Sequence, residues 1–205
     1  MSTDSLHSLI PEIALAAGLA WGSGLRLYAV LSIVGLAGLA GWLPLPEHLA
    51  LLSHPMVLSA SCFMALVEFG ADKLPWLDSV WDAVHTFIRI PAGAALAAGV
   101  FGAGESSMAV AAAILGGTVS AGTHLAKAGG RAAINTSPEP FTNWFASFTE
   151  DMAVPGGLWL AVAHPVAFLV FLAVFAVMVV VLLRTIVKGL GTLALRLRTR
   201  NSRPG

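Results

Sequence analysis

Six apolar segments, each long enough to cross a lipid bilayer as an α-helix, follow one another along this chain. They cover residues 10–43, 55–74, 78–101, 106–128, 141–162 and 165–187. About 20 apolar residues suffice for one crossing. Only 11% of the 205 residues are charged, whereas a soluble domain carries about 25%, so too few polar residues remain to cover a water-facing surface. The sequence therefore predicts an all-α, polytopic transmembrane helix bundle that forms one domain.

The first segment, residues 10–43, is too long for a single crossing, and Gly22-Ser23-Gly24 interrupts it. Clusters of glycine and serine are typical of breaks in a helix. We expect either a hairpin of two halves or a short re-entrant piece followed by a full span from Leu25 to Leu43. Broken or re-entrant helices are therefore part of the predicted fold, and the side of the membrane on which the N-terminus lies stays open.

Basic residues set the expected orientation, because the cytoplasmic loops of membrane proteins carry an excess of Lys and Arg. The tail, residues 188–205, is strongly basic, which places it in the cytoplasm after the final span at 165–187. Counting spans backwards, the turns at Lys73 and at Lys127/Arg131 lie on the same side. We expect a multi-pass protein of the cell (inner) membrane with a cytoplasmic C-terminus.

Two stretches resemble each other and indicate an internal repeat. Residues 81–93 and 144–157 both start at Trp and end in Pro-x-Gly. Each follows an apolar span that ends in charged residues, so hairpins 55–101 and 106–162 would be parallel repeats related by an axis along the membrane normal. The alternative is chance similarity between apolar helices that contain Pro and Gly.

Charged side chains stand inside these apolar segments at helical spacing. Asp78, Asp82, His85 and Arg89 follow each other at intervals of four, three and four residues, so they form a stripe on one helix face. With a rise of 1.5 Å per residue, Arg89 lies roughly 16 Å deeper than Asp78, near the bilayer midplane. An unpaired guanidinium there costs several kcal/mol, so Arg89 needs an acidic partner.

The depths of the carboxylates predict which partner Arg89 has. Glu68 lies roughly 7 Å from the inner end of the preceding span, at the depth of Asp82 rather than of Arg89. Glu150 and Asp151 lie roughly 13–15 Å along the span of the second hairpin. We therefore expect Arg89 to pair with Glu150 or Asp151, as a buried ion pair or a gate between the two hairpins.

The other polar side chains of the hairpins are candidates for binding a substrate or ion, or for coupling to protons. His124, Lys127 and Arg131 form a second stripe, in which Arg131 is expected to reach the membrane interface and His124 could exchange protons near neutral pH. The candidate set is Glu68, Asp72, Asp78, Asp82, His85, His124, Lys127 and Asn143.

The usual metal-binding and hydrolase motifs are missing from the sequence. It contains no Glu-x-x-His or His-x-x-x-His pattern, so we expect neither a metal site nor a cofactor. Nor does it contain a Gly-x-Ser-x-Gly elbow, a His-Glu-x-x-His motif or a Gly-rich phosphate loop. We therefore do not expect an enzyme.

Two long motifs resemble the signatures of an uncharacterised bacterial membrane family. The first runs from Glu68 through Asp72-Lys73-x-Pro75 to Arg89, and the second from Thr123-His124 through Lys127, Arg131 and Asn135-Thr136-Ser137-Pro138-Glu139-Pro140 to Glu150-Asp151. In these motifs the chain is similar to the domain of unknown function family 4126, and the likeness covers most of its length. The family implies a membrane fold but no activity. Gly70 and Arg26 depart from its pattern, which favours a larger apolar residue and a neutral polar residue there.

Together these features favour a small transporter or channel for an ion or small solute that uses the buried acidic and histidine residues. One alternative is a membrane-embedded enzyme or lipid-handling protein at the cytoplasmic leaflet, in which His124, Lys127 and Arg131 hold an anionic headgroup. Another is a structural or assembly role. The expected partners are the lipid bilayer and the solute or ion, with no nucleic acid. A homo-oligomer is also plausible, since small residues allow close helix contacts; these are Gly93, Ala97, Gly116 and Gly117.

Overall fold

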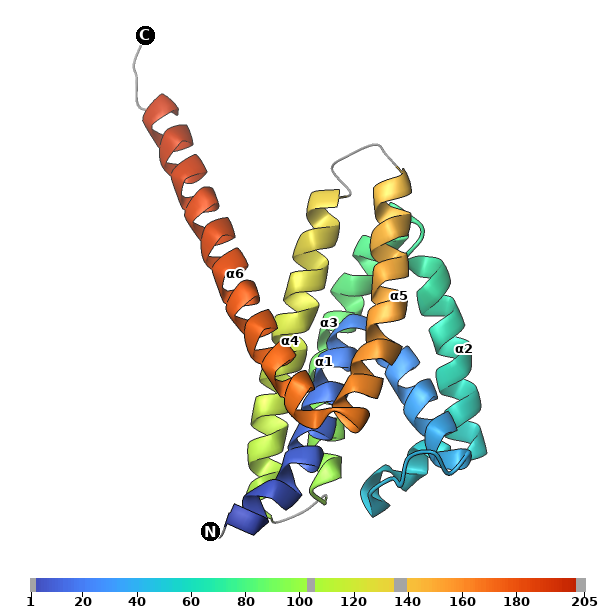
Figure 1. The fold of residues 1–205 in the computed structure, drawn as a ribbon. Coiled ribbons are helices and arrows are strands. Elements are labelled where there is room, and N and C mark those ends of the chain that lie inside the picture. The colour runs from blue at the N-terminus through green and yellow to red at the C-terminus, as the bar shows by residue number, and fades with distance from the viewer. Residues whose placement is uncertain (1–2, 103–105, 135–139, 202–205) are drawn as a thin grey trace.

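The computed structural model describes residues 3–102, 106–134 and 140–201, and every regular element in these ranges is a helix (Figure 1). In chain order they are α1 (Thr3–Leu39), the 3-10 helix η1 (Glu47–Ser53), α2 (Pro55–Ala71), α3 (Pro75–Val100), α4 (Ser107–Ile134), α5 (Pro140–Ala163) and α6 (Pro165–Asn201). Four of them begin at a proline, where the missing N–H costs no helical hydrogen bond. The predicted all-α fold is confirmed, and each of the six apolar segments forms a helix.

Four helical stretches in the described part of the chain are long and apolar enough to cross a membrane. They are Leu9–Leu39, Trp76–Val100, Ser107–Ile134 and Pro165–Thr185. The pair η1 and α2, bent by 66°, would add a fifth. These lengths and compositions are those of a polytopic membrane protein. Residues 135–139 of the second motif and most side chains of the tail at 188–205 lie outside the described residues.

α1 is broken at Arg26, whose backbone is extended (φ −145°, ψ 87°). The chain reverses there, and the second half of α1 returns to the side from which the first half came (Figure 1). Leu15 and Val34 therefore line one and the same cavity, although a continuous helix would hold them about 28 Å apart. The predicted break is confirmed, but the expected full span from Leu25 is wrong, because the returning half is only about 20 Å long.

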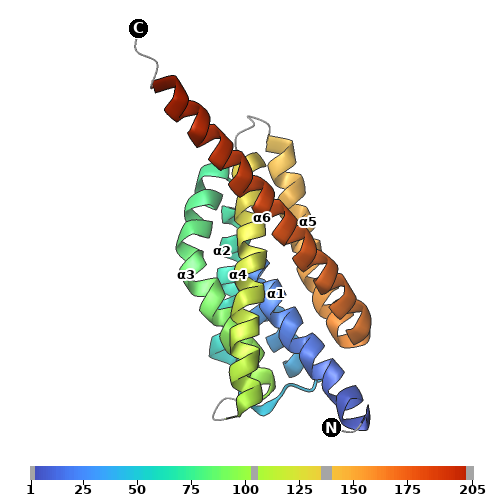
Figure 2. The same cartoon turned by 90° about the vertical axis from the view of Figure 1, so that its left-hand side faces the viewer.

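Small residues let the re-entrant α1 hairpin pack closely against α3 and α4, and let α3 and α4 pack closely on each other (Figures 1 and 2). A Cβ at Gly24 would lie 2.5 Å from the carbonyl oxygen of Ser120, and one at Gly93 would lie 2.5 Å from the Ser120 Cβ. A Cβ at Gly116 would collide with Ala97. Three of the small residues considered for contacts between subunits thus serve contacts between helices of one chain.

α6 is held at its N-terminal half and diverges from the bundle toward its C-terminal end (Figures 1 and 2). Trp21 of α1 packs edge-on against Phe168, Phe171 and Phe175 of α6, with ring centroids 5.4–6.2 Å apart. Aromatic pairs in this arrangement add to the energy of burial. The two-hairpin repeat expected from the sequence is not confirmed by this arrangement and stays a prediction.

Candidate functional site

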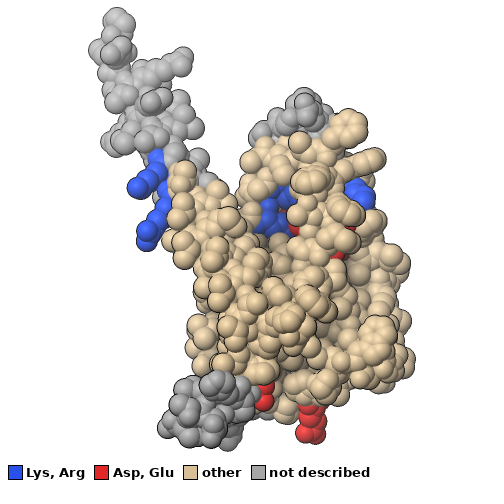
Figure 3. Space-filling model, in the orientation of Figure 1, with Lys and Arg blue, Asp and Glu red and all other residues tan. Residues whose placement is uncertain are grey.

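Charged side chains from α1 to α5 meet inside the bundle, toward the turn that joins α2 to α3. We call this set the charged network. Its basic members are Arg26, Arg89, Lys127 and Arg131, and its acidic members are Glu68, Asp72, Asp78, Asp82, Glu150 and Asp151. All but Glu150 and Asp151 are buried. Figure 3 shows blue and red side chains in a hollow of the otherwise tan upper surface.

Arg89 pairs with acids of its own hairpin, which corrects the predicted pairing with Glu150 or Asp151. Its Nη2 donates to Glu68 Oε1 and its Nη1 to Asp82 Oδ1, both at 2.7 Å. Depth along a helix gives the position of the backbone only, whereas helical side chains lean toward the N-terminus of their helix. In the antiparallel α2 and α3 the long side chains of Glu68 and Arg89 therefore lean toward each other and meet.

Lys127 joins the parts of the charged network. Its Nζ donates to Asp72 Oδ2 at 3.0 Å and lies 3.3 Å from Glu150 Oε2 and 3.5 Å from Asp82 Oδ1. It also donates to the carbonyl of Leu25 at 3.2 Å. This carbonyl is one of those that the break in α1 deprives of a helical partner. Lys127 thus connects α2, α3 and α5 to the tip of the re-entrant hairpin.

Arg26 is a network member that the sequence did not predict as a candidate. Its Nη1 lies 2.9 Å from Asp72 Oδ2 and its Nε lies 2.9 Å from Asp151 Oδ1. Its Nη2 donates to Ser147 Oγ at 3.0 Å. An arginine beside a Gly-Ser-Gly break in an apolar segment was a usable signal, because a guanidinium in that environment must be paired.

Arg131 and the predicted candidate Asn143 belong to the charged network as well. Arg131 Nε donates to Glu150 Oε1 at 3.0 Å, and its Nη1 donates to Asn143 Oδ1 at 2.5 Å and to the Asp72 carbonyl at 3.2 Å. The Arg131 side chain is only 2% exposed. Arg131 is therefore not the exposed, snorkelling side chain that was expected, because acidic and carbonyl oxygens hold its guanidinium inside the bundle.

The two predicted histidines lie at the edge of the network. His85 stacks on Trp81, hydrogen-bonds to the Trp81 carbonyl through Nδ1 at 2.8 Å, and lies 3.3 Å from the hydroxyl of Tyr28 through Nε2. His124 Nδ1 lies 3.2 Å from Arg89 Nη1. A guanidinium only donates, so this contact is a hydrogen bond only while His124 Nδ1 carries no proton.

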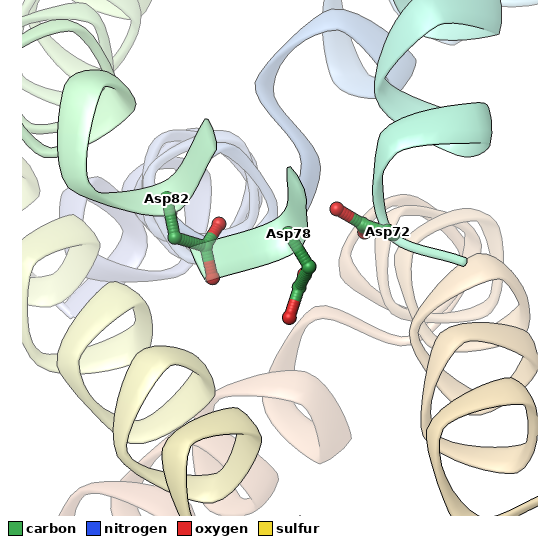
Figure 4. Close-up of side chains that lie close together, drawn as sticks. All are labelled: Asp72, Asp78 and Asp82. Carbon is green, nitrogen blue, oxygen red and sulfur yellow. The ribbon is translucent and has the colours of Figure 1, made fainter. Parts of the chain in front are cut away.

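Three of the predicted acidic residues form a compact group. Oxygens of Asp72, at the end of α2, and of Asp78 and Asp82, on α3, lie within 4.8 Å of one another (Figure 4). Carboxylate oxygens are the ligands that hard divalent cations prefer. Basic side chains contact the Asp72 and Asp82 carboxylates. A cation entering this group would therefore compete with them.

Carboxylates outnumber buried basic groups in the charged network by six to four. Lys73, in the turn after α2, lies 3.9 Å from Asp151 but is one-third exposed. Burial alone would raise the pKa of Asp72, but Lys127 and Arg26 hold it below its ordinary value. The surplus carboxylates of the charged network can take up a proton or another cation.

The fold and the site define a polytopic helical membrane protein with a buried charged network between its helices. The chain belongs to the family described as Domain of unknown function (DUF4126), whose model matches residues 13–185. This confirms the resemblance seen in the motifs. Comparison with the curated proteins and with the solved structures finds no match.

Proposed function

We propose that this protein is a transporter or channel that carries an ion or small solute through the charged network. The observation that supports this most is the break of the re-entrant α1 at Arg26 in contact with that network. Irregular backbone at membrane depth is tolerated where it is buried in protein or lines a cavity, and broken helices commonly form the binding sites of transporters.

The balance of charges favours a cation as the transported species. Fully ionised, the six carboxylates would exceed the four buried basic groups by two charges, and by one when Lys73 beside Asp151 is counted as well. Uncompensated charge in a low-dielectric interior is costly. Uptake of a proton or of another cation would remove that cost, and its release would restore it, which is the property that a transient binding site needs.

Lys127 and Arg26 are the groups that a passing cation would displace. Both contact Asp72 Oδ2, at 3.0 Å and 2.9 Å, so a cation at the Asp72 carboxylate would loosen the tip of the α1 hairpin. This tip is where α1 meets α4. We place the turn between α2 and α3 and the C-terminal end of α6 on the cytoplasmic side of the inner membrane, following the basic residues.

Flux into liposomes that contain the purified full-length protein tests this proposal. The panel holds gradients of protons, Na⁺, K⁺ and Mg²⁺ and a set of small metabolites. We expect flux of at least one species above that of protein-free liposomes. The variants Glu68→Gln and His85→Ala should lower it at least about tenfold, an increase of about 1.4 kcal/mol in the barrier.

A matched control is Glu47→Gln, which makes the same change on η1, at an exposed site outside the charged network. Its flux should equal that of the unmodified protein. Absence of flux for every species on the panel, or equal flux for Glu68→Gln and Glu47→Gln, would show the transport proposal to be wrong.

A further inference from the structure

A pocket opens between α3 and α4 at the periphery of the charged network, and two charged residues, Asp82 and Arg131, are part of its lining. It has a volume of about 210 Å³ and is lined by Asp82, Ala83 and Thr86 of α3 and by Ala128, Arg131 and Ala132 of α4, among others. A water molecule occupies about 30 Å³ in the liquid, so the pocket has room for a small polar group of several heavy atoms. The transport proposal makes no use of it.

Both charged side chains of this pocket have a buried atom without a hydrogen bond. These atoms are Asp82 Oδ2, an acceptor, and Arg131 Nη2, a donor. The side chains are only 5% and 2% exposed. Arg131 Nη2 lies 3.9 Å from Asp72 Oδ2, which is beyond hydrogen-bond distance. Leaving such atoms unsatisfied is costly, so the pocket suits a ligand that carries both an anionic and a cationic group.

The mouth of the pocket faces the bilayer near one of its surfaces. Ala83 and Ala132 are exposed on helices that are long and apolar enough to cross the membrane. Asp82 lies about 10 Å along α3 from its first residue, and Arg131 about 5 Å from the end of α4. This is the depth at which headgroups meet acyl chains. Val84 beside the mouth is also exposed, and it would contact acyl chains.

From these observations we propose that the pocket between α3 and α4 binds the headgroup of a phospholipid that carries a phosphate and a primary ammonium. The Arg131 guanidinium donates to the phosphate, and the ammonium donates to the Asp82 carboxylate. Phosphatidylethanolamine has both groups. The trimethylammonium of phosphatidylcholine has no N–H to donate, and phosphatidylglycerol has no cation, so both should bind more weakly. This inference does not depend on transport.

Lipid retention by the full-length protein in a neutral detergent tests the proposal. Phosphatidylethanolamine, phosphatidylcholine and phosphatidylglycerol with identical acyl chains are added, and the bound lipid is measured by native mass spectrometry. We expect phosphatidylethanolamine to bind at least about tenfold more tightly than the other two, which corresponds to about 1.4 kcal/mol. Ala83→Leu, which fills the pocket without changing a charge, should abolish this preference.

Ala95→Leu is the matched control, because Ala95 is an exposed alanine of the same helix that does not line the pocket. It should retain the lipid preference. Equal retention of the three lipids, or an unchanged preference in Ala83→Leu while that variant keeps the thermal stability of Ala95→Leu, would overturn the proposal. Soluble phosphoethanolamine is measured in the same binding assay. If it binds as tightly as the lipid, the headgroup does not need to come from a lipid, and that part of the proposal is wrong.

Phosphatidylethanolamine selectivity in a protein that gives no flux would refute transport and leave the lipid site standing. If flux is lost in Glu68→Gln but the protein retains the three lipids equally, the transport proposal stands and the lipid site is refuted. The two proposals therefore fail separately.

Discussion

Replacing Lys127 by methionine removes a buried positive charge that three acids of the charged network share. The Lys127 Nζ has carboxylate oxygens of three helices at 3.0, 3.3 and 3.5 Å, and the side chain is fully buried. Methionine fills a similar volume but carries no charge, so three carboxylates lose a partner. Removing one side of a buried ion pair costs about 3–5 kcal/mol. In a protein of this size that lowers the melting temperature by roughly 6 to 20 °C.

Thermal unfolding of the full-length protein in detergent, followed by tryptophan fluorescence, measures the effect. Lys188→Met makes the same change at an exposed site on α6 and should shift the melting temperature by less than about 2 °C. The double variant Lys127→Met with Asp72→Asn should lose less than the sum of the two single losses, because both single variants break the same Lys127–Asp72 ion pair. A melting temperature for Lys127→Met within about 2 °C of the unmodified protein would refute the reasoning, as would a double variant with the full sum of both losses.

Three further predictions use the same thermal assay. Gly24→Ala puts a Cβ against the backbone of α4 and should cost about 1–3 kcal/mol, whereas Gly122→Ala meets open space and should be neutral; equal shifts would contradict the close packing. Arg26→Lys should destabilise the protein almost as much as Arg26→Met, because an ammonium lacks the fork that reaches several partners at once; full rescue by lysine would argue otherwise. Tyr28→Phe removes only the hydroxyl near His85 and should cost at most about 1.5 kcal/mol, so a larger loss would mean that this contact is coupled to the charged network.

The helices could be predicted from the sequence because they depend on local properties. Apolar length, prolines at segment ends and the Gly-Ser-Gly break lie within single segments, and the structure has helices at all six and a break two residues from Gly24. The partner of Arg89 was not predictable in the same way. The identity of this partner depends on which helices are neighbours and on the direction in which long side chains lean. The depth of a residue along its helix gives no information on either.

The candidate residues were largely those that the structure brings together, because burial of an ionisable group is costly wherever it occurs. What the sequence did not predict is how they divide among partners. Arg26 and Arg131 appeared to be a departure from a family pattern and an interfacial residue, respectively. Both are buried, because the reversal of α1 carries Arg26 into the charged network and Asp72 and Asn143 draw Arg131 inward.

The reversal of α1 also sets an order of events during synthesis. Ser147, which accepts a hydrogen bond from Arg26, follows it by 121 residues. At 5–20 residues per second, roughly 6 to 24 s pass before the ribosome has made that partner. Asp72, which is made well before Ser147, is the first acidic partner that can neutralise the Arg26 guanidinium. The first helix to be made therefore completes its contacts only after α5 has been made, because Ser147 and Asp151 both belong to α5.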